Sequence, residues 1–161
     1  MFFVVQWIAL LLGAIIHTLV DQRPERRTAP RVVELFLLWL LGGGGLWNIL
    51  TGLFHISPMS AQIAAGIGYT PSMFQWEVGW ADIALGALGF LSLWRRDSFM
   101  TAAVTGIAIA FWGFALGHII AFSHGNQAES NVWAIPHDIL YPAVLIWLLS
   151  RYRKQASAKG A

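Results

Sequence analysis

Five long apolar runs alternate with short polar junctions along this chain. A helix needs about 20 residues, at 1.5 Å per residue, to cross a hydrocarbon core of about 30 Å. The pattern therefore predicts an all-α integral membrane protein with five transmembrane helices. The runs cover residues 2–20, 32–54, 74–94, 99–122 and 133–149.

The junction between the second and third runs carries its own helix signals. Ser57 followed by Pro58 is typical of the cap and first position of a helix, and Gly66 and Gly68 are stop signals. We expect a short helix over residues 58–65, lying in the membrane interface between spans two and three.

The basic residues predict an orientation. All ten fall in three places, and the junctions 57–72 and 123–131 contain none. Short cytoplasmic loops retain Lys and Arg, whereas translocated loops do not, so we expect the N-terminus outside and the C-terminus in the cytoplasm. The three basic places hold Arg23, Arg26, Arg27 and Arg31; Arg95 and Arg96; and Arg151, Arg153, Lys154 and Lys159.

Composition agrees with a membrane protein. The chain is 57% hydrophobic and 11% charged, whereas soluble domains have about 25% charged residues. We expect one helical bundle over residues 1–154 and a disordered cytoplasmic tail over 155–161. The net charge of +2 reflects loop anchors that meet anionic lipid headgroups. The bilayer is the expected partner, and nucleic acid is not.

Cysteine is absent from the sequence. This excludes disulfides, iron–sulfur clusters and thiolate catalysis. A bound metal would therefore be held by histidine and carboxylate side chains.

Four helices each bring a metal-ligand type of residue to the outer end of the predicted bundle: His55, Glu77, His118 and Asp138. Two histidines and two carboxylates from facing helices have the composition of a bundle-core metal site, so we expect a divalent metal here. A haem held by His55 and His118 is a weaker alternative. A third is a hydrogen-bonded polar cap, because Glu77 and Asp138 lie at helix starts where the dipole favours carboxylates.

Asp82 is the strongest single candidate for chemistry. It lies eight residues into the third run, about 12 Å along a helix, among glycines that leave room for a ligand. A charged side chain at that depth is a functional-site candidate by default. We assign Asp82 and Glu77 as candidate catalytic residues.

A second polar group is predicted at the inner side, where His17 and Glu34 could form a pair. Glycines also recur at helical spacing. Those at 79, 86 and 89, and at 106, 113 and 117, predict close helix packing. The run Gly42 to Gly45 predicts close contact or a helix irregularity at mid-membrane.

Several motifs resemble those of a known family. They are Glu34-Leu-Phe-Leu-Leu-Trp, Phe74-Gln-Trp-Glu-Val-Gly, Ala84-Leu-Gly-Ala-Leu-Gly, Gly117-His118 and Asp138-Ile-Leu-Tyr-Pro142. Together they resemble an uncharacterised bacterial family of small integral membrane proteins, distantly similar to DoxX-like four-helix proteins. The resemblance implies a compact helical bundle in the bacterial inner membrane and assigns no reaction.

Three functions remain open from the sequence. The first is a metal- or cofactor-dependent membrane enzyme or redox protein acting on a lipophilic small molecule, with Trp47, Trp76, Trp80, Phe114 and Tyr141 lining the pocket. The second is a proton-coupled transporter, since acidic or histidine side chains occur at three depths. The third is an accessory subunit of a larger membrane complex or homo-oligomer, without catalysis.

Overall fold

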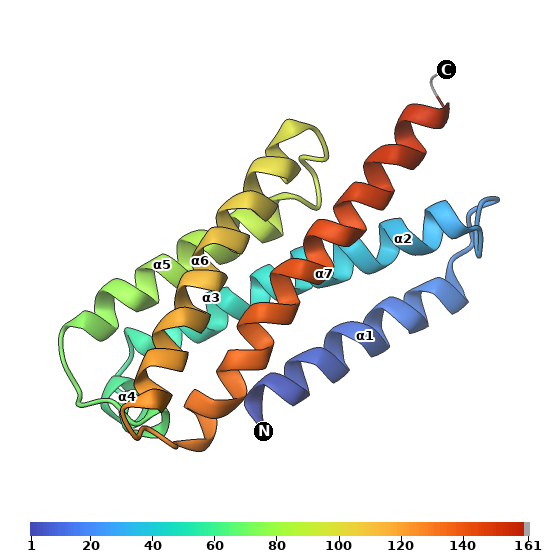
Figure 1. Ribbon diagram of the computed structural model, residues 1–161. Helices are drawn as coiled ribbons and strands as arrows, with labels where there is room; N and C mark the ends of the chain where they lie inside the picture. The colour runs from blue at the N-terminus through green and yellow to red at the C-terminus, as the bar shows by residue number, and fades with distance from the viewer. Residues whose placement is uncertain (160–161) are drawn as a thin grey trace.

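The computed structural model describes residues 1–159, and all regular secondary structure in that range is helical (Figure 1). A π-helix joins α2 to α3, so residues 29–55 form one long continuous helix. The elements are α1 (Phe2–Val20), α2 (Ala29–Leu38), η1 (Trp39–Gly43), α3 (Gly44–His55), α4 (Ser60–Ile67), α5 (Phe74–Leu91), α6 (Ser98–Ser123) and α7 (Glu129–Lys159).

Four helices are long and apolar enough to span a membrane: residues 2–20, 29–55, 98–123 and 129–157. The all-helical fold is confirmed, and these four helices fit the predicted membrane protein by their length and composition. The fifth predicted span corresponds to α5, which has 18 residues and is not among these four. Gln75, Glu77 and Asp82 make α5 more polar than the other long helices. Five spans and their orientation therefore stay predictions.

The short helix between spans two and three is present as α4, shifted by two residues from the predicted range. It ends at Gly68, whose positive φ of 81° is a left-handed conformation that favours glycine. At its other end, Ser57 forms a turn, in which the Met59 amide donates to Ser57 Oγ at 3.1 Å.

The C-terminal helix is longer than its apolar run. α7 continues to Lys159, so residues 155–159 of the predicted disordered tail are helical. Residues 160–161 of that tail lie outside the described residues. Two prolines, Pro136 and Pro142, lie inside α7, and each removes one hydrogen bond to the carbonyl four residues earlier. For Pro142 that carbonyl belongs to Asp138.

The Gly42 to Gly45 run produces both predicted effects. η1 is a local π-helix over Trp39–Gly43, and a Cβ at Gly45 would lie 2.5 Å from the Gly86 carbonyl oxygen of α5. Gly52 and Gly79 face each other in the same way. Glycine therefore lets the backbones of α3 and α5 touch, as small residues do in membrane bundles.

The glycines of α6 behave differently. A Cβ at Gly106, Gly113 or Gly117 would meet nothing within 4 Å in the described chain. The close packing predicted for this stripe is therefore not made within the chain. α6 instead packs through its other face, where Met100, Val104 and Ile107 join a core with α2 and α7.

The bundle has two chemically different ends (Figure 1). The connection from α1 to α2, the connection from α5 to α6 and the C-terminal part of α7 lie at one end, which we call the basic end. The N-terminus, α4 and the connection from α6 to α7 lie at the other, which we call the opposite end. All three basic segments of the sequence thus meet at the basic end.

Candidate functional site

The opposite end contains a buried carboxyl group flanked by two imidazoles. Asp138, on α7, is 4% exposed. Its Oδ2 lies 3.8 Å from His118 Nε2, and its Oδ1 lies 4.0 Å from His137 Nε2. These distances exceed those of a hydrogen bond, so the carboxyl group lies next to both imidazoles without being bonded to either.

A buried asparagine orients one of these imidazoles. Asn131, at the start of α7, is fully buried, and its Oδ1 lies 2.7 Å from His118 Nδ1. The Asn131 side-chain amide also donates to the backbone carbonyls of His118 and Asn126, at 3.3 and 3.1 Å. Because its carbonyl oxygen can only accept, it favours a proton on His118 Nδ1 and leaves Nε2 facing Asp138.

His137 is enclosed by aromatic rings. Its own ring lies 4.6 Å from the ring of Phe3 and 5.4 Å from the ring of Tyr141, centre to centre. Trp7 and Phe111 complete the surroundings. His137 is 5% exposed, and its Nδ1 is buried without a hydrogen-bond partner among the described residues. One nitrogen therefore faces Asp138 while the other lacks a partner.

Asp82, the predicted catalytic residue of α5, is half-buried, and its side chain makes no hydrogen bond or ion pair among the described residues. The candidate site therefore consists of His118, His137 and Asp138, supported by Asn131. Asp82 is a further ionisable side chain on α5.

The other two predicted metal ligands lie apart from this arrangement. His55 is buried, and its Nδ1 donates to Gln75 Oε1 at 2.6 Å. Glu77 is exposed on the first turn of α5. Across the described part of the chain, no three His, Asp or Glu side chains converge so that they could hold a metal ion. Of the four predicted ligands, the structure brings His118 and Asp138 together, and metal binding at this set stays a prediction.

The aromatic residues expected to line one lipophilic pocket also separate. Trp76 and Trp80 are 46% and 56% exposed on α5. Tyr141 is 2% exposed in the core, and its hydroxyl donates to the Leu40 carbonyl at 2.7 Å. Trp76 and Trp80 therefore lie at the surface, whereas Tyr141 lies in the core with Phe114 packed against the same cluster.

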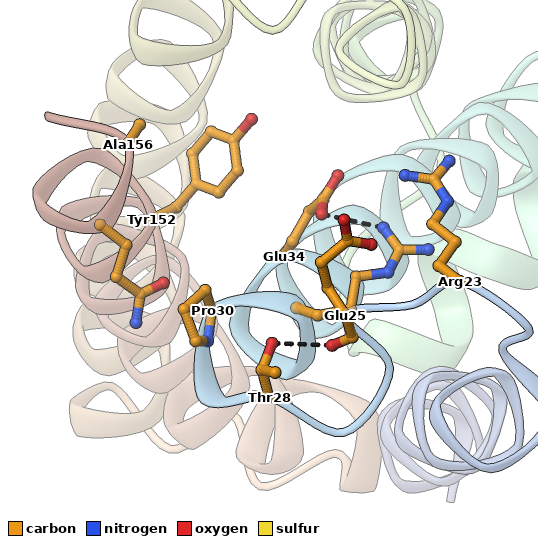
Figure 2. A pocket seen from close by; sticks show the side chains of 9 residues that line it. Arg23, Glu25, Thr28, Pro30, Glu34, Tyr152 and Ala156 are labelled. Atoms are coloured by element: carbon orange, nitrogen blue, oxygen red, sulfur yellow. Dashed lines mark hydrogen bonds and ion pairs between the residues drawn. The ribbon is translucent and has the colours of Figure 1, made fainter. Parts of the chain in front are cut away.

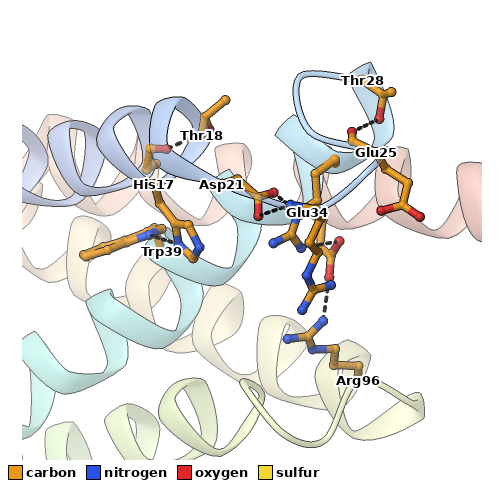
Figure 3. Close-up of polar contacts among 11 residues, drawn as sticks. His17, Thr18, Asp21, Glu25, Thr28, Glu34, Trp39 and Arg96 are labelled. Atoms are coloured by element: carbon orange, nitrogen blue, oxygen red, sulfur yellow. Dashed lines mark hydrogen bonds and ion pairs between the residues drawn. The ribbon is translucent and has the colours of Figure 1, made fainter.

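The basic end holds a chain of ion pairs that the sequence did not reveal (Figure 3). Arg31 Nε donates to Asp21 Oδ2 at 2.7 Å, and Arg31 Nη1 donates to Glu34 Oε2 at 2.8 Å. Glu34 Oε1 then accepts from Arg96 Nη1 at 2.5 Å. Asp21 and Arg31 are buried, at 6% and 7% exposed. The hydrogen bond from Arg31 lowers the pKa of the Asp21 carboxyl below its usual value.

The predicted pair between His17 and Glu34 is wrong. Trp39 Nε1 donates to His17 Nδ1 at 3.1 Å, whereas Glu34 forms ion pairs with Arg31 and Arg96 (Figure 3). His17 is exposed on α1, so its bond to Trp39 ties α1 to η1. His17 and Glu34 thus belong to two separate sets of contacts.

Further contacts join α7 to the start of α6 at the basic end. The Arg153 guanidinium donates to the Asp97 carbonyl and to Thr101 Oγ1. The Asp97 carboxylate accepts from the Phe99 amide at 2.8 Å, which caps α6. That hydrogen bond lowers the pKa of the Asp97 carboxyl.

Comparison with known proteins gives one family. A family of unknown function, DUF6790, matches over residues 1–158. No curated protein and no solved structure matches the chain. The resemblance to an uncharacterised family is confirmed, and the likeness to DoxX-like proteins stays a prediction.

Proposed function

We propose that this chain, which belongs to the family of unknown function DUF6790, is a membrane protein that binds and releases a proton at Asp138. The observation that carries the proposal is the placement of the buried Asp138 carboxyl group between the Nε2 atoms of His118 and His137. Ionisable side chains inside membrane helices are costly, and they mark proton relays and ion pathways.

Asp82 on α5 is a second candidate proton acceptor, because a half-buried carboxyl group within a membrane helix is a functional-site candidate by default. Within the site itself, the Nε2 atoms of His118 and His137 face the Asp138 carboxyl group. A proton can therefore pass between Asp138 and either imidazole.

The role we propose is a small proton-coupled transporter of the bacterial inner membrane, with its basic end in the cytoplasm. The grouping of all three basic segments at one end supports this orientation. Pro136 and Pro142 flank the site on α7. The backbone hydrogen bonds that they remove make this stretch of α7 the place where protonation could alter helix geometry.

A metal- or cofactor-dependent enzyme acting on a lipophilic substrate is less well supported. It would use Asp82 and Glu77 as catalytic residues, but Glu77 is exposed, and no three candidate metal ligands converge in the described residues. Glu77 therefore serves as a matched control in tests of the proton site.

Infrared difference spectroscopy on the purified protein tests proton binding directly. Between about pH 5 and pH 8, the range in which histidine titrates, the wild type should show a change in a protonated-carboxyl band. Asp138→Asn should lose that change, and Glu77→Gln should retain it. A band unaffected by Asp138→Asn would overturn the proposal.

Transport is tested in proteoliposomes that contain a pH-sensitive dye and are challenged with pools of small solutes. We expect a solute-dependent proton flux that Asp138→Asn abolishes and Glu77→Gln leaves unchanged. If infrared spectroscopy detects the proton site but no solute produces a flux, the transporter role is overturned and the proton site stands.

A further inference from the structure

A polar pocket of about 300 Å³ lies at the basic end, between the α1–α2 connection, the first turns of α2 and the C-terminal part of α7. Figure 2 shows Glu25 and Glu34 in its centre, Arg23 on one side and Tyr152 on the other. The pocket is far from the proposed proton site, and its chemistry is independent of it.

Two side chains of the ion-pair chain, Arg31 and Glu34, line this pocket. Arg31 is paired with both Asp21 and Glu34, and Glu34 is paired with Arg96 as well. The charges of Arg31 and Glu34 are therefore balanced within the chain of ion pairs. Glu34 keeps a partly exposed carboxylate, at 17% exposed.

The remaining charges of the pocket are one of each sign. Arg23 and Glu25 are exposed, and neither side chain forms an ion pair among the described residues, although both line the pocket. The Thr28 hydroxyl donates to the Glu25 backbone carbonyl at 2.7 Å, which holds this turn of the connection in place. A ligand that complements the pocket therefore carries both an anionic and a cationic group.

The far side of the pocket adds an apolar surface and a hydrogen-bond acceptor. Pro30, Ala156 and the Tyr152 ring lie on this side (Figure 2). Gln155 also lines the pocket, and its Oε1 is buried with no hydrogen-bond partner in the described chain. Tyrosine is enriched where membrane and water meet, so this side suits the glycerol part of a lipid.

We propose that this pocket binds a phosphoethanolamine group. Its phosphate lies beside the Arg23 guanidinium, and its ammonium group donates to the Glu25 and Glu34 carboxylates. An anionic headgroup without an amine would leave the unpaired Glu25 carboxylate without a partner, because Glu34 is already paired with Arg31 and Arg96. A quaternary ammonium would bring no N–H donors to either carboxylate. The group is carried by a phospholipid headgroup or by a soluble phosphoethanolamine ester.

The test measures the thermal unfolding temperature of the purified full chain in detergent with four added probes. They are short-chain phosphatidylethanolamine, phosphatidylcholine, phosphatidylglycerol and soluble glycerophosphoethanolamine. We expect phosphatidylethanolamine to raise the unfolding temperature in a saturable way, with much smaller effects of the choline and glycerol lipids. A response to the soluble ester as well would show that the headgroup alone is recognised, whereas a response to the lipid only would assign the lipid as the source.

Matched variants locate the binding. Glu25→Gln and Arg23→Gln should each weaken phosphatidylethanolamine binding about tenfold or more, the expected effect of losing a hydrogen bond to a charged group. Arg26→Gln, which changes a neighbouring exposed arginine outside the pocket lining, should leave binding unchanged. Equal stabilisation by phosphatidylglycerol, or equal loss in Arg26→Gln, would overturn the proposal.

Discussion

The polar side chains are tightly paired at the basic end of the bundle and loosely paired at the opposite end. At the basic end, Asp21, Arg31, Glu34 and Arg96 are joined by contacts of 2.5 to 2.8 Å. At the opposite end, Asp138 lies 3.8 and 4.0 Å from its two imidazoles, and His137 Nδ1 has no partner in the described chain. Asp21 and Arg31 at one end are buried, as are His137 and Asp138 at the other, whereas Arg96 is 37% exposed.

This difference suggests a structural role for the polar side chains of the basic end and a chemical role for those of the opposite end. Short, reciprocal ion pairs hold the connections between helices in place, and their charges are already satisfied. Loosely paired ionisable groups in a low-dielectric interior are costly to retain, and they remain free to exchange a proton. We therefore expect the basic end to determine stability and the opposite end to determine activity.

The largest expected effect is at the centre of the basic network. Arg31→Leu removes the side chain shared by Asp21 and Glu34 and should lower the free energy of unfolding by about 2 to 3 kcal/mol. This loss is at or below the smallest usually found when one partner of a buried ion pair is removed. We expect a small value because Arg23 and Arg96 remain near the two carboxylates. Chemical denaturation in mild detergent measures the change.

Arg95→Leu is the matched control for that experiment. Arg95 lies 3.4 Å from Asp97, and both side chains are more than half exposed, so the loss should stay below about 1 kcal/mol. Equal losses in the two arginine variants would show that the buried network is not special.

Acid should weaken the same network. The Arg31 hydrogen bond lowers the pKa of Asp21 in the folded protein, so its stabilising contribution is fully present above the unfolded value of about 3.9. That contribution is lost as the pH falls through the lower folded value. We expect the wild type to exceed Asp21→Asn in stability between about pH 5 and pH 7. The difference should shrink as the pH falls below about 4. A difference that grew on acidification would contradict this sign.

Tyr141 links the core to the π-helix between the two ends. Tyr141→Phe removes the hydrogen bond from its hydroxyl to the Leu40 carbonyl, and it should cost about 1 kcal/mol. Tyr152→Phe is the control, because the Tyr152 hydroxyl makes no hydrogen bond among the described residues. If both variants unfold like the wild type, the hydrogen bond from Tyr141 to the Leu40 carbonyl does not contribute to stability.

The main helices were predictable because apolar length is a local property of the sequence. α1 and α6 begin and end within a residue of their predicted runs. α4 also ends where its glycines require, since Gly68 adopts a left-handed conformation. By contrast, the length of α7 depends on residues beyond its apolar run, and hydropathy carries no signal for them.

Only some residues of the candidate site could be predicted, because the rotation of each helix about its axis decides which side chains point into the bundle. Glu77 and Asp82 lie on one helix, but Gly79 and Gly86 face α3. Residue 77 is about 200° around the helix from Gly79, whereas residue 82 is only about 60° from it. The glycine stripe therefore indicated that Glu77 points away from the packed face of α5, whereas Asp82 lies close to it.

The ion-pair chain and His137 had no comparable signal. Asp21 and Arg31 meet because the α1–α2 connection folds back, with Arg27 in a left-handed conformation at φ 64°. The conformation of that connection cannot be inferred from spacing. His137 adjoins Asp138 in sequence, yet only the rotation of α7 and its prolines place both side chains inside the bundle.

The smallest expected change in stability, and the sharpest test of the comparison, is Asp138→Asn. Asparagine has the same shape and can hydrogen-bond to either imidazole, and it removes a buried ionisable group that is only loosely paired. The free energy of unfolding should therefore change by less than about 1 kcal/mol or rise slightly, while the proton-linked infrared signal disappears. A loss as large as that of Arg31→Leu would assign Asp138 to the structural framework and remove the distinction between the two ends.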